Sequence, residues 1–485
     1  MQFIIISYFK GINGNKISLE NANIYTLEEQ KNIFNFNSIK DNPYLATEYL
    51  INIFNNFSRL NFTLFDKNVN KLKEEIYFII QNKNKYKDLY IILSSIYGAF
   101  LADAMGSNTE FKPKDKNNHL LIYGSGGIFK PGQITDDSEM AMSQAFAILD
   151  NYQYKSLNPN LLYYYYIAWY KSKPLDIGTT TSKALSYLDF QNLVITDENI
   201  FTEKIKNKIK DKNYESLANG FLMRSSPFLT WFYMVYKDFV SLILETKSIN
   251  KYFELYKKIH DEFSKDTQCT HPNPETSVAG SIMIFMGLCA MQQKYSGKEI
   301  LEMTKILLKN NYFSNMSNEN EYKLKLHFED ALNQFSRTNF SKDEYFGNLY
   351  NQMGFYKHAF NLTLYYLYVF DEQKDSMSME EIYLNMMYDI SDFGGDTDTN
   401  GAIVGMIMGP LIGMENFSKK YFDVFLNFYS RERLIYTNVL MYFYAKYLEE
   451  IKNCAKNIEK DKYGVNFYFI EMILKMLNTE ININN

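Results

Sequence analysis

The chain has 485 residues and a formal net charge of −5, from 51 basic and 56 acidic side chains. Hydrophobic residues make up 46% of the chain and charged residues 22%, which is ordinary globular usage and excludes a wholly disordered chain. This charge balance shows no basic footprint of the kind that nucleic-acid-binding proteins carry. Length alone predicts about two or three domains.

Cysteine usage and the apolar stretches indicate where the protein works. Cys269, Cys289 and Cys454 are far apart and form no CxxC pair, so neither a zinc knuckle nor a disulfide framework is expected. This pattern is typical of a reducing compartment, and we expect an intracellular, cytoplasmic protein. The N-terminal residues lack the basic start of a signal peptide. Val278–Met291 and Ala402–Met414 fall short of the roughly 18 residues of a membrane span, so both are expected to be buried core helices.

In chain order, residues 1–85 are rich in Asn and Lys and are predicted to form a small accessory region of unknown role. From residue 86 to 485 the sequence predicts one large all-α domain, because strand alternation is scarce and apolar helical segments recur. These segments are Leu89–Met105, Glu139–Leu149, Leu161–Lys171, Leu217–Met223, Phe228–Ile243, Pro274–Gln292, Gly297–Leu308, Tyr356–Tyr368, Met379–Tyr388, Gly401–Met414, Phe422–Phe428, Arg433–Ile451 and Val465–Leu477. The polar segments Asp189–Tyr214 and Asn310–Asn351 are interpreted as surface insertions.

Two acidic clusters lie where polar loops meet apolar helices. The first is Thr135-Asp136-Asp137-Ser138, and the second is Asp396-Thr397-Asp398-Thr399 after the diglycine Gly394-Gly395. The diglycine permits a close backbone approach or a positive φ. In the helix that follows, glycine recurs at every fourth residue, which permits close packing on one face, and Pro410 is expected to bend or break that helix.

Aspartates at helix starts have an ordinary explanation, because a carboxylate there caps the first turn, and Thr135 or Asp136 would be a natural N-cap. A cap needs one carboxylate, however, whereas each cluster has two beside a hydroxyl. If the clusters met, a like-charge pair at about 4 Å would cost about 4 kcal/mol at an effective dielectric of about 20. Cations would then be required, and oxygen ligands without His or Cys favour Mg²⁺, Mn²⁺ or Ca²⁺ over Zn²⁺.

Six sequence blocks, taken in order, resemble the ADP-ribosylglycohydrolases, the family of dinitrogenase reductase-activating glycohydrolase. They are Gly98–Gly106 with Glu110, Thr135–Ser138, Asp176–Thr180, Asn219–Arg224, Thr270–Pro272 and Gly394–Thr399. The resemblance covers about residues 90–415 and leaves residues 1–85 outside. It implies an all-α, multi-helix orthogonal bundle.

The resemblance also implies a binuclear centre of two Mg²⁺ or Mn²⁺ ions. By this resemblance Thr135, Asp136 and Asp137 bind the ions from one side, and Asp396, Asp398 and Thr399 bind them from the other. Glu110 matches the family glutamate near the metals and is the candidate acid/base residue. The alternative is a water activated by a neighbouring aspartate, with Asp137 and Asp398 as the candidates.

The other blocks supply candidate substrate contacts. Gly178, Thr179 and Thr180 resemble the family loop near the diphosphate, although a turn with an N-cap would explain them equally well. Asn219 and Gly220 resemble residues that contact ADP-ribose, and His271 matches a histidine that lines the family's pocket, although a lone histidine is usually structural. Arg224 is interpreted as a residue that tethers a loop, and Asp103 as a buried polar partner.

The predicted function is metal-dependent hydrolysis of the glycosidic bond that joins ADP-ribose to a protein side chain or another acceptor. The expected partner is an ADP-ribosylated protein or small molecule, and the linkage is open. A catalytically inactive, ADP-ribose-binding or structural descendant of the fold is the alternative. The complete set of predicted ligands favours an enzyme. Another two-metal hydrolase, such as a phosphoesterase, usually has His ligands, but none of the five histidines adjoins either cluster.

Overall fold

The structure is a computed structural model that describes residues 73–124, 127–151, 155–171, 174–187, 201–347, 349–428 and the single positions 441, 444, 445 and 448. Residues 1–72 of the predicted accessory region lie outside these ranges. So do the predicted helices Arg433–Ile451 and Val465–Leu477, apart from those single positions. The division into an accessory region and a catalytic domain therefore stays a prediction.

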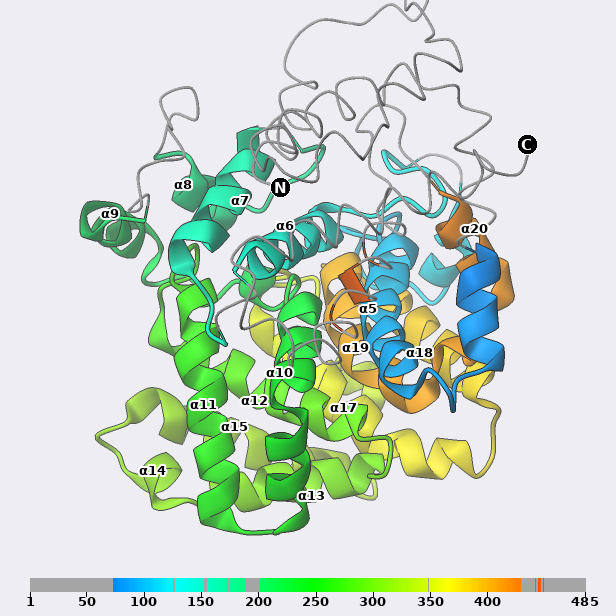
Figure 1. Ribbon diagram of the computed structural model, residues 1–485. Coiled ribbons are helices and arrows are strands. Elements are labelled where there is room, and N and C mark those ends of the chain that lie inside the picture. The colour runs from blue at the N-terminus through cyan, green and yellow to red at the C-terminus, as the bar shows by residue number, and fades with distance from the viewer. Residues whose placement is uncertain are drawn as a thin grey trace, which may run out of the picture.

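The described residues fold into helices joined by loops, and they form no strand beyond the isolated bridges Lys112–Gly395 and Ala218–Phe355 (Figure 1). The predicted all-α class is confirmed. The α-helices are α5 (Lys87–Gly106), α6 (Asp136–Asp150), α7 (Pro159–Lys171), α8 (Thr179–Leu185), α9 (Glu203–Asn213), α10 (Ser226–Glu245), α11 (Ile249–Thr267), α12 (Pro274–Met291), α13 (Gly297–Leu308), α14 (Asn311–Ser314), α15 (Glu319–Phe335), α16 (Lys342–Tyr345), α17 (Tyr356–Lys374), α18 (Met379–Phe393), α19 (Thr397–Ile412) and α20 (Lys419–Asn427). The 3₁₀ helices are η3 (Asn118–Leu121), η5 (Asn219–Phe221) and η6 (Met414–Asn416).

Three sequence interpretations are wrong. Leu217–Met223 forms only the short η5 rather than an α-helix, because this segment turns to line the pocket described below. The segment Asn310–Asn351 is not a surface insertion throughout, since α15 buries Leu324, Phe328, Ala331 and Phe335 in the core. Likewise, within 201–214, α9 buries Ile205, Ile209 and Asn213.

Helices α5 and α19 pack side by side in the middle of the molecule (Figure 1). Their glycines make this possible. A Cβ atom on Gly405 would lie 2.2 Å from the carbonyl oxygen of Gly98, and one on Gly409 would lie 2.2 Å from that of Ser94. The predicted close packing along the glycine row is therefore confirmed, and it holds the ends of α5 and α19 together.

Pro410 does not break α19, which continues to Ile412. Proline lacks an N–H, so the carbonyl of Met406, four residues earlier, loses its partner within the helix. The Ser95 Oγ on α5 donates a hydrogen bond to that carbonyl at 2.9 Å. Helix α5 thus replaces the bond that proline removes.

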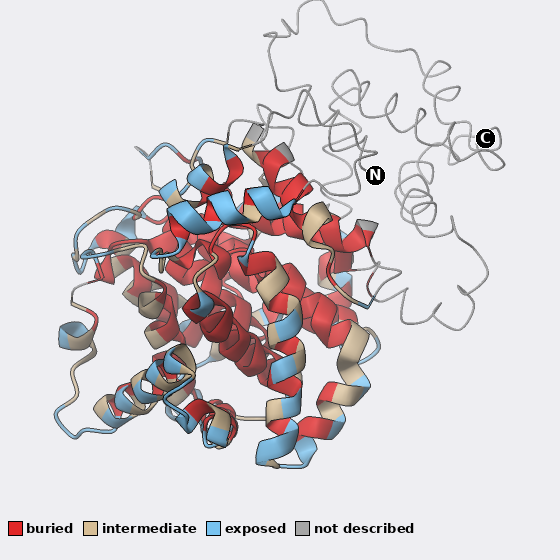
Figure 2. Cartoon of the chain, turned by 90° about the vertical axis from the view of Figure 1, so that its left-hand side faces the viewer, coloured by how far each residue is buried: buried red, intermediate tan, exposed pale blue. Residues whose placement is uncertain are grey.

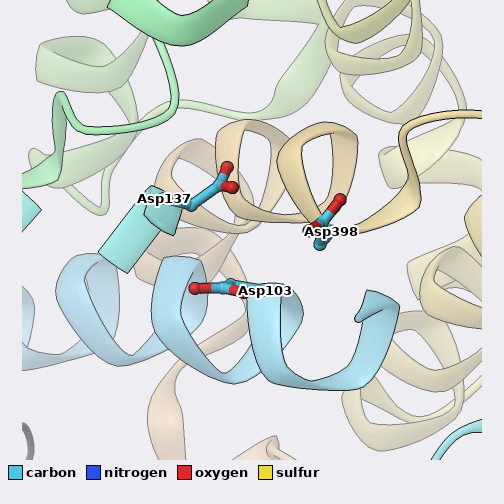
Figure 3. A group of neighbouring side chains, drawn as sticks. All are labelled: Asp103, Asp137 and Asp398. Carbon is cyan, nitrogen blue, oxygen red and sulfur yellow. The ribbon is translucent and has the colours of Figure 1, made fainter. Parts of the chain in front are cut away.

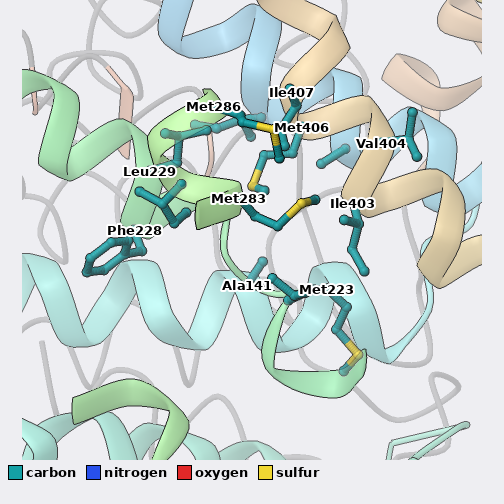
Figure 4. Packing of buried hydrophobic residues seen from close by; sticks show 14 of the residues in the cluster. Ala141, Met223, Phe228, Leu229, Met283, Met286, Ile403, Val404, Met406 and Ile407 are labelled. Atoms are coloured by element: carbon teal, nitrogen blue, oxygen red, sulfur yellow. The ribbon is translucent and has the colours of Figure 1, made fainter. Parts of the chain in front are cut away.

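The helices nearest the centre are buried on all sides, while the outer helices keep an exposed face (Figure 2). Among the described residues, α5 and α12 have the length and hydropathy of membrane spans, but 100% and 94% of their most apolar windows are buried inside the protein. They act here as core helices. Met283 and Met286 of α12 lie beside Leu229 of α10 and Met406 of α19 (Figure 4).

Candidate active site

The first acidic cluster opens α6. Thr135 is the N-cap, and its Oγ1 accepts a hydrogen bond from the backbone N–H of Asp137, so the hydroxyl caps the helix and the Asp136 and Asp137 carboxylates do not. Asp103 of α5 accepts hydrogen bonds from the backbone N–H groups of Thr135, at 3.1 Å, and Ser138, at 3.2 Å. Asp103 is thus buried and hydrogen-bonded, as expected, and its carboxylate also belongs to the acidic group described below.

The second cluster opens α19. Asp396 occupies the N-cap position, yet its side chain makes no capping hydrogen bond; its Oδ2 accepts one from Asn219 Nδ2 at 2.7 Å instead. Gly394 and Gly395 have φ values of +71° and +79°. A Cβ on Gly394 would lie 2.4 Å from the carbonyl oxygen of Lys112. The diglycine therefore provides both the positive φ and the close approach.

The two clusters meet. Thr399 Oγ1 donates a hydrogen bond to Asp137 Oδ2 at 3.2 Å. One carboxylate oxygen each of Asp103, Asp137 and Asp398 lies within 4.8 Å of the other two, and the same is true of Glu110, Asp396 and Asp398. Figure 3 shows the carboxylates of Asp103, Asp137 and Asp398 gathered from α5, α6 and α19.

The electrostatics of this group are unfavourable without a cation. Burial raises the pKa values of Asp136, Asp137 and Asp398 well above their usual range, and the neighbouring carboxylates raise them further. Burial, followed by the charge of Asp396, raises the pKa of Glu110 to about 10. At an effective dielectric of about 20, two ionised carboxylates about 4.8 Å apart repel by about 3–4 kcal/mol.

The donor atoms fit hard divalent cations. Asp137 Oδ1 is buried and has no hydrogen-bond partner among the described residues, which is costly unless something binds it. Carboxylate and hydroxyl oxygens are the ligands that Mg²⁺ and Mn²⁺ prefer. The residues at this centre therefore fit the ions that the sequence predicts.

A pocket of about 320 Å³ opens beside the acidic centre. Its lining includes many of the predicted site residues: Glu110, Asp136, Gly178, Thr179, Thr180, Asn219, Gly220, His271, Asp396 and Thr399. Thr135, Asp137 and Asp398 do not line it. Their contacts place them next to lining residues, since Thr135 and Asp137 adjoin Asp136, and Asp398 lies beside Glu110 and Asp396.

Helix α9 holds two parts of the pocket lining in place, the start of α8 and the loop between α11 and α12. Asn213 Nδ2 donates hydrogen bonds to the carbonyl oxygens of Thr180, at 2.8 Å, and Thr270, at 2.9 Å. Gly178 is the N-cap residue of α8, so the ordinary interpretation of this turn holds as well, but its residues still face the pocket. The segment interpreted as an insertion thus supports the site.

Some lining residues were not among the predicted site residues. Asp176 lines the pocket and contributes to the raised pKa of Glu110 and of Asp136; its signal was its place at the head of the Asp176–Thr180 block. Phe111 also lines the pocket, and its only signal was adjacency to Glu110. Gly354 contributes a backbone carbonyl that accepts from the Asn219 N–H at 2.9 Å, and no sequence pattern marked it.

The family model described as ADP-ribosylglycohydrolase matches residues 84–444. The chain belongs to this family. It is 30% identical over 361 residues to a protein of Acanthamoeba polyphaga mimivirus that is named, provisionally, an ADP-ribosyl glycohydrolase, covering 70% of this chain and 92% of that protein. The resemblance drawn from the six sequence blocks is confirmed.

Two further similarities are more limited. The ADP-ribosyl-(dinitrogen reductase) glycohydrolase of Rhodospirillum rubrum is 29% identical over 99 residues, which are 19% of this chain and 33% of that protein. A solved structure titled ADP-ribosylglycohydrolase-related protein complex superposes with a TM-score of 0.47 at 18% identity, over 75% of this chain and 99% of the other.

Proposed function

We propose that this protein hydrolyses the glycosidic bond between ADP-ribose and a protein side chain or another acceptor. Beyond family membership, one observation carries the proposal: both acidic clusters and Glu110 converge beside a single pocket. That pocket is also lined by the Asp176–Thr180, Asn219–Gly220 and His271 segments. Its expected substrates are ADP-ribosylated proteins or small molecules that contain ADP-ribose.

The acidic centre would hold two Mg²⁺ or Mn²⁺ ions. Thr135, Asp136 and Asp137 supply oxygens from the start of α6, and Asp396, Asp398 and Thr399 supply them from the start of α19. When bound, such ions would offset part of the carboxylate charge, which lowers the repulsion among these groups, and would supply Lewis-acid polarisation.

The protein's own residues divide the remaining work. Glu110 lines the pocket beside Asp396 and Asp398, where it can transfer a proton to or from the reacting group. Cleavage of a glycosidic bond develops positive, oxocarbenium-like charge at the sugar, and the Asp136 and Asp396 carboxylates in the pocket lining stabilise that charge. Gly178, Thr179, Thr180, Asn219, Gly220 and His271 bind and orient the ADP-ribosyl group.

The test is incubation with arginine-linked and serine-linked ADP-ribosylated proteins, in Mg²⁺ and in EDTA, with released ADP-ribose measured chromatographically. We expect release from at least one substrate, in Mg²⁺ only. Asp398→Asn should abolish release, whereas the same change at the exposed Asp375 should not. A folded protein that binds Mg²⁺ and ADP-ribose but releases nothing from any substrate would instead support the inactive descendant.

A further inference from the structure

A chain of buried polar groups lies behind the pocket and ends at His271. It starts at the ion pair between Arg224 and Asp266, both of which have fully buried side chains. Arg224 Nε and Nη2 donate to Asp266 Oδ2 at 3.1 and 2.9 Å. The other oxygen, Oδ1, accepts from the Tyr166 hydroxyl and from Gln144 Nε2. These contacts fix the plane and position of the guanidinium group.

Arg224 also positions two residues at the pocket, Thr270 and Gly220, through two further hydrogen bonds. Its Nη2 donates to Thr270 Oγ1 at 2.8 Å, and its Nη1 donates to the carbonyl oxygen of Gly220 at 3.1 Å. A guanidinium group can only donate, so Thr270 Oγ1 must be the acceptor in this contact. The hydrogen of the Thr270 hydroxyl must therefore be donated to a different acceptor.

That hydrogen has one acceptor within the described residues, the Nδ1 of His271 at 2.8 Å. If Nδ1 carried a proton instead, Thr270 Oγ1 would accept twice, and both its buried hydroxyl hydrogen and the Nε2 lone pair of His271 would lack partners among the described residues. The Nε2–H tautomer leaves only the Nε2–H group without one, and a ligand acceptor in the pocket can satisfy it. An unsatisfied buried donor costs about 1–3 kcal/mol. The network therefore makes Nδ1 the acceptor, and a neutral imidazole whose Nδ1 accepts carries its proton on Nε2.

The Nε2 atom of His271 is the ring nitrogen that the described part of the protein leaves without a partner. His271 is 1% exposed and lines the pocket, and its Nε2 has no hydrogen-bond partner among the described residues. A Cβ atom on Gly220 would lie 3.0 Å from Cε1 and 3.2 Å from Nε2, so the glycine keeps this edge uncrowded. Burial and the charge of Arg224 lower the pKa of His271 well below its usual value, which keeps the ring neutral.

We propose that Arg224 and Thr270 are positioning residues that lock His271 in its Nε2–H tautomer, so that it donates a hydrogen bond to an oxygen acceptor of the bound substrate. The choice of substrate rests on the proposed function, since the diphosphate and sugar oxygens of ADP-ribose are acceptors. A neutral ring with one N–H donor favours ligands that place an acceptor oxygen at this position. A ligand that places only a donor there would find no hydrogen-bond partner on His271.

The tautomer is tested on the ligand-free protein by ¹⁵N NMR of labelled histidine. The chain has only five histidines, and His271→Gln identifies the resonances of His271 by their loss. We expect the Nε2–H tautomer in the wild type, a mixture in Thr270→Val, which keeps the shape but lacks the hydroxyl, and the wild-type spectrum again in Thr270→Ser. An Nδ1–H tautomer in the wild type, or no change in Thr270→Val, would overturn the proposal.

The donor role is tested by calorimetric titration of ADP-ribose into the Mg²⁺-loaded protein. Thr270→Val should weaken binding about tenfold, Thr270→Ser should restore it, and His271→Gln, whose amide places a donor near Nε2, should bind more tightly than His271→Ala. Equal binding by all variants would refute the donor role. A wild type that binds no ADP-ribose would count against the proposed function, and the NMR result would still decide the tautomer. If Thr270→Val does not fold, the wild-type spectrum and the two His271 variants decide.

Discussion

Glu110 shows how a single residue is placed by the segments around it. The N–H of the next residue, Phe111, donates to the carbonyl oxygen of Gly395 at 2.8 Å, and the Gly395 N–H donates back to the carbonyl oxygen of Lys112 at 2.8 Å. This bridge ties the segment after α5 to the diglycine before α19. It therefore holds the Glu110 carboxylate beside Asp396 and Asp398.

Glu110→Gln should lower kcat by about 10²- to 10⁴-fold and change KM much less, because an acid/base group acts in the transition state. Steady-state kinetics on the best substrate, with Mg²⁺ present, measure this. Glu302→Gln, the same change on an exposed part of α13, is the matched control. Near-wild-type turnover by Glu110→Gln would show that Glu110 is not the acid/base residue.

Asp398→Asn removes one charge from a crowded anionic group and keeps the side chain's size. The metal-free protein should be as stable as the wild type or slightly more stable, because repulsion falls. Mg²⁺ affinity should fall about tenfold or more, since loss of groups that merely support metal ligands already costs that much. Chemical unfolding in EDTA and Mg²⁺ titration measure the two effects. Strong destabilisation with full affinity would mark Asp398 as structural.

His271 makes stability depend on pH. Burial lowers the pKa of His271 in the folded protein well below the 6.5 of an exposed histidine. Below about pH 6.5, therefore, His271 binds a proton in the unfolded chain but not in the folded protein. Stability is then fully present above the unfolded pKa and is lost as pH falls. From about pH 6.5 to about pH 5, the wild type should lose up to about 2 kcal/mol more free energy of unfolding than His271→Gln. Urea unfolding of both proteins at several pH values would test this. An identical change of unfolding free energy with pH in the two proteins would contradict it.

At the scale of helices, the sequence predicted best the segments whose apolar residues run together. Helix α13 has the predicted bounds, and α5, α7, α10 and α12 begin and end within two residues of the prediction. Helix α11 was not predicted, although it buries Tyr252, Leu255, Tyr256, Ile259 and Phe263 at helical spacing. Lysines and acidic residues interrupt this stripe, so periodicity rather than apolar content was the signal.

Some features of the candidate site could also be predicted from the sequence, and others could not. The predicted ligands are neighbours within two short motifs, so their side-chain types alone indicated a cation. The glycine row indicated close packing on one face of α19, but the identity of α5 as its partner, and the meeting of the two motifs, became visible only in the fold. The contribution of Gly354 is a backbone carbonyl, and no side-chain pattern encodes that. The network from Asp266 to His271 joins elements that are distant in the sequence, and it required the fold.

Gly405→Ala tests the crossing of α5 and α19. The added methyl group would lie 2.2 Å from the Gly98 carbonyl oxygen, which belongs to rigid backbone, so the helices must separate. We expect a loss of about 1–3 kcal/mol or more in the free energy of unfolding, together with weaker Mg²⁺ binding. Gly178→Ala is the control for stability, because a Cβ there meets nothing within 4 Å. Equal unfolding midpoints for the two variants would refute the tight crossing.

At the scale of the whole molecule, the acidic centre joins α5, α6 and α19, and cations there would link separate parts of the fold. Mg²⁺ should therefore raise the unfolding temperature, by an amount that corresponds to about 2.7 kcal/mol at a concentration of about 100 Kd. Thermal unfolding in EDTA and over a Mg²⁺ series measures this. The increase should be much smaller in Asp398→Asn and unchanged in Asp375→Asn. A wild-type unfolding temperature that does not change with Mg²⁺ concentration would show that these carboxylates do not bind Mg²⁺.

The distance along the chain between the two acidic clusters has a consequence for biosynthesis. Asp136 is translated 260 residues before Asp396, and α19 then packs against α5, which left the ribosome much earlier. Until α19 has been made, the nascent chain holds only one of the two acidic clusters, so the complete centre cannot form. Long-range closure of this kind is slow and leaves apolar surface exposed while it is pending. Helix α19 completes the centre, and it is synthesised late, although α20 adds further buried residues after it; metal capture would therefore report that α19 has packed into the domain.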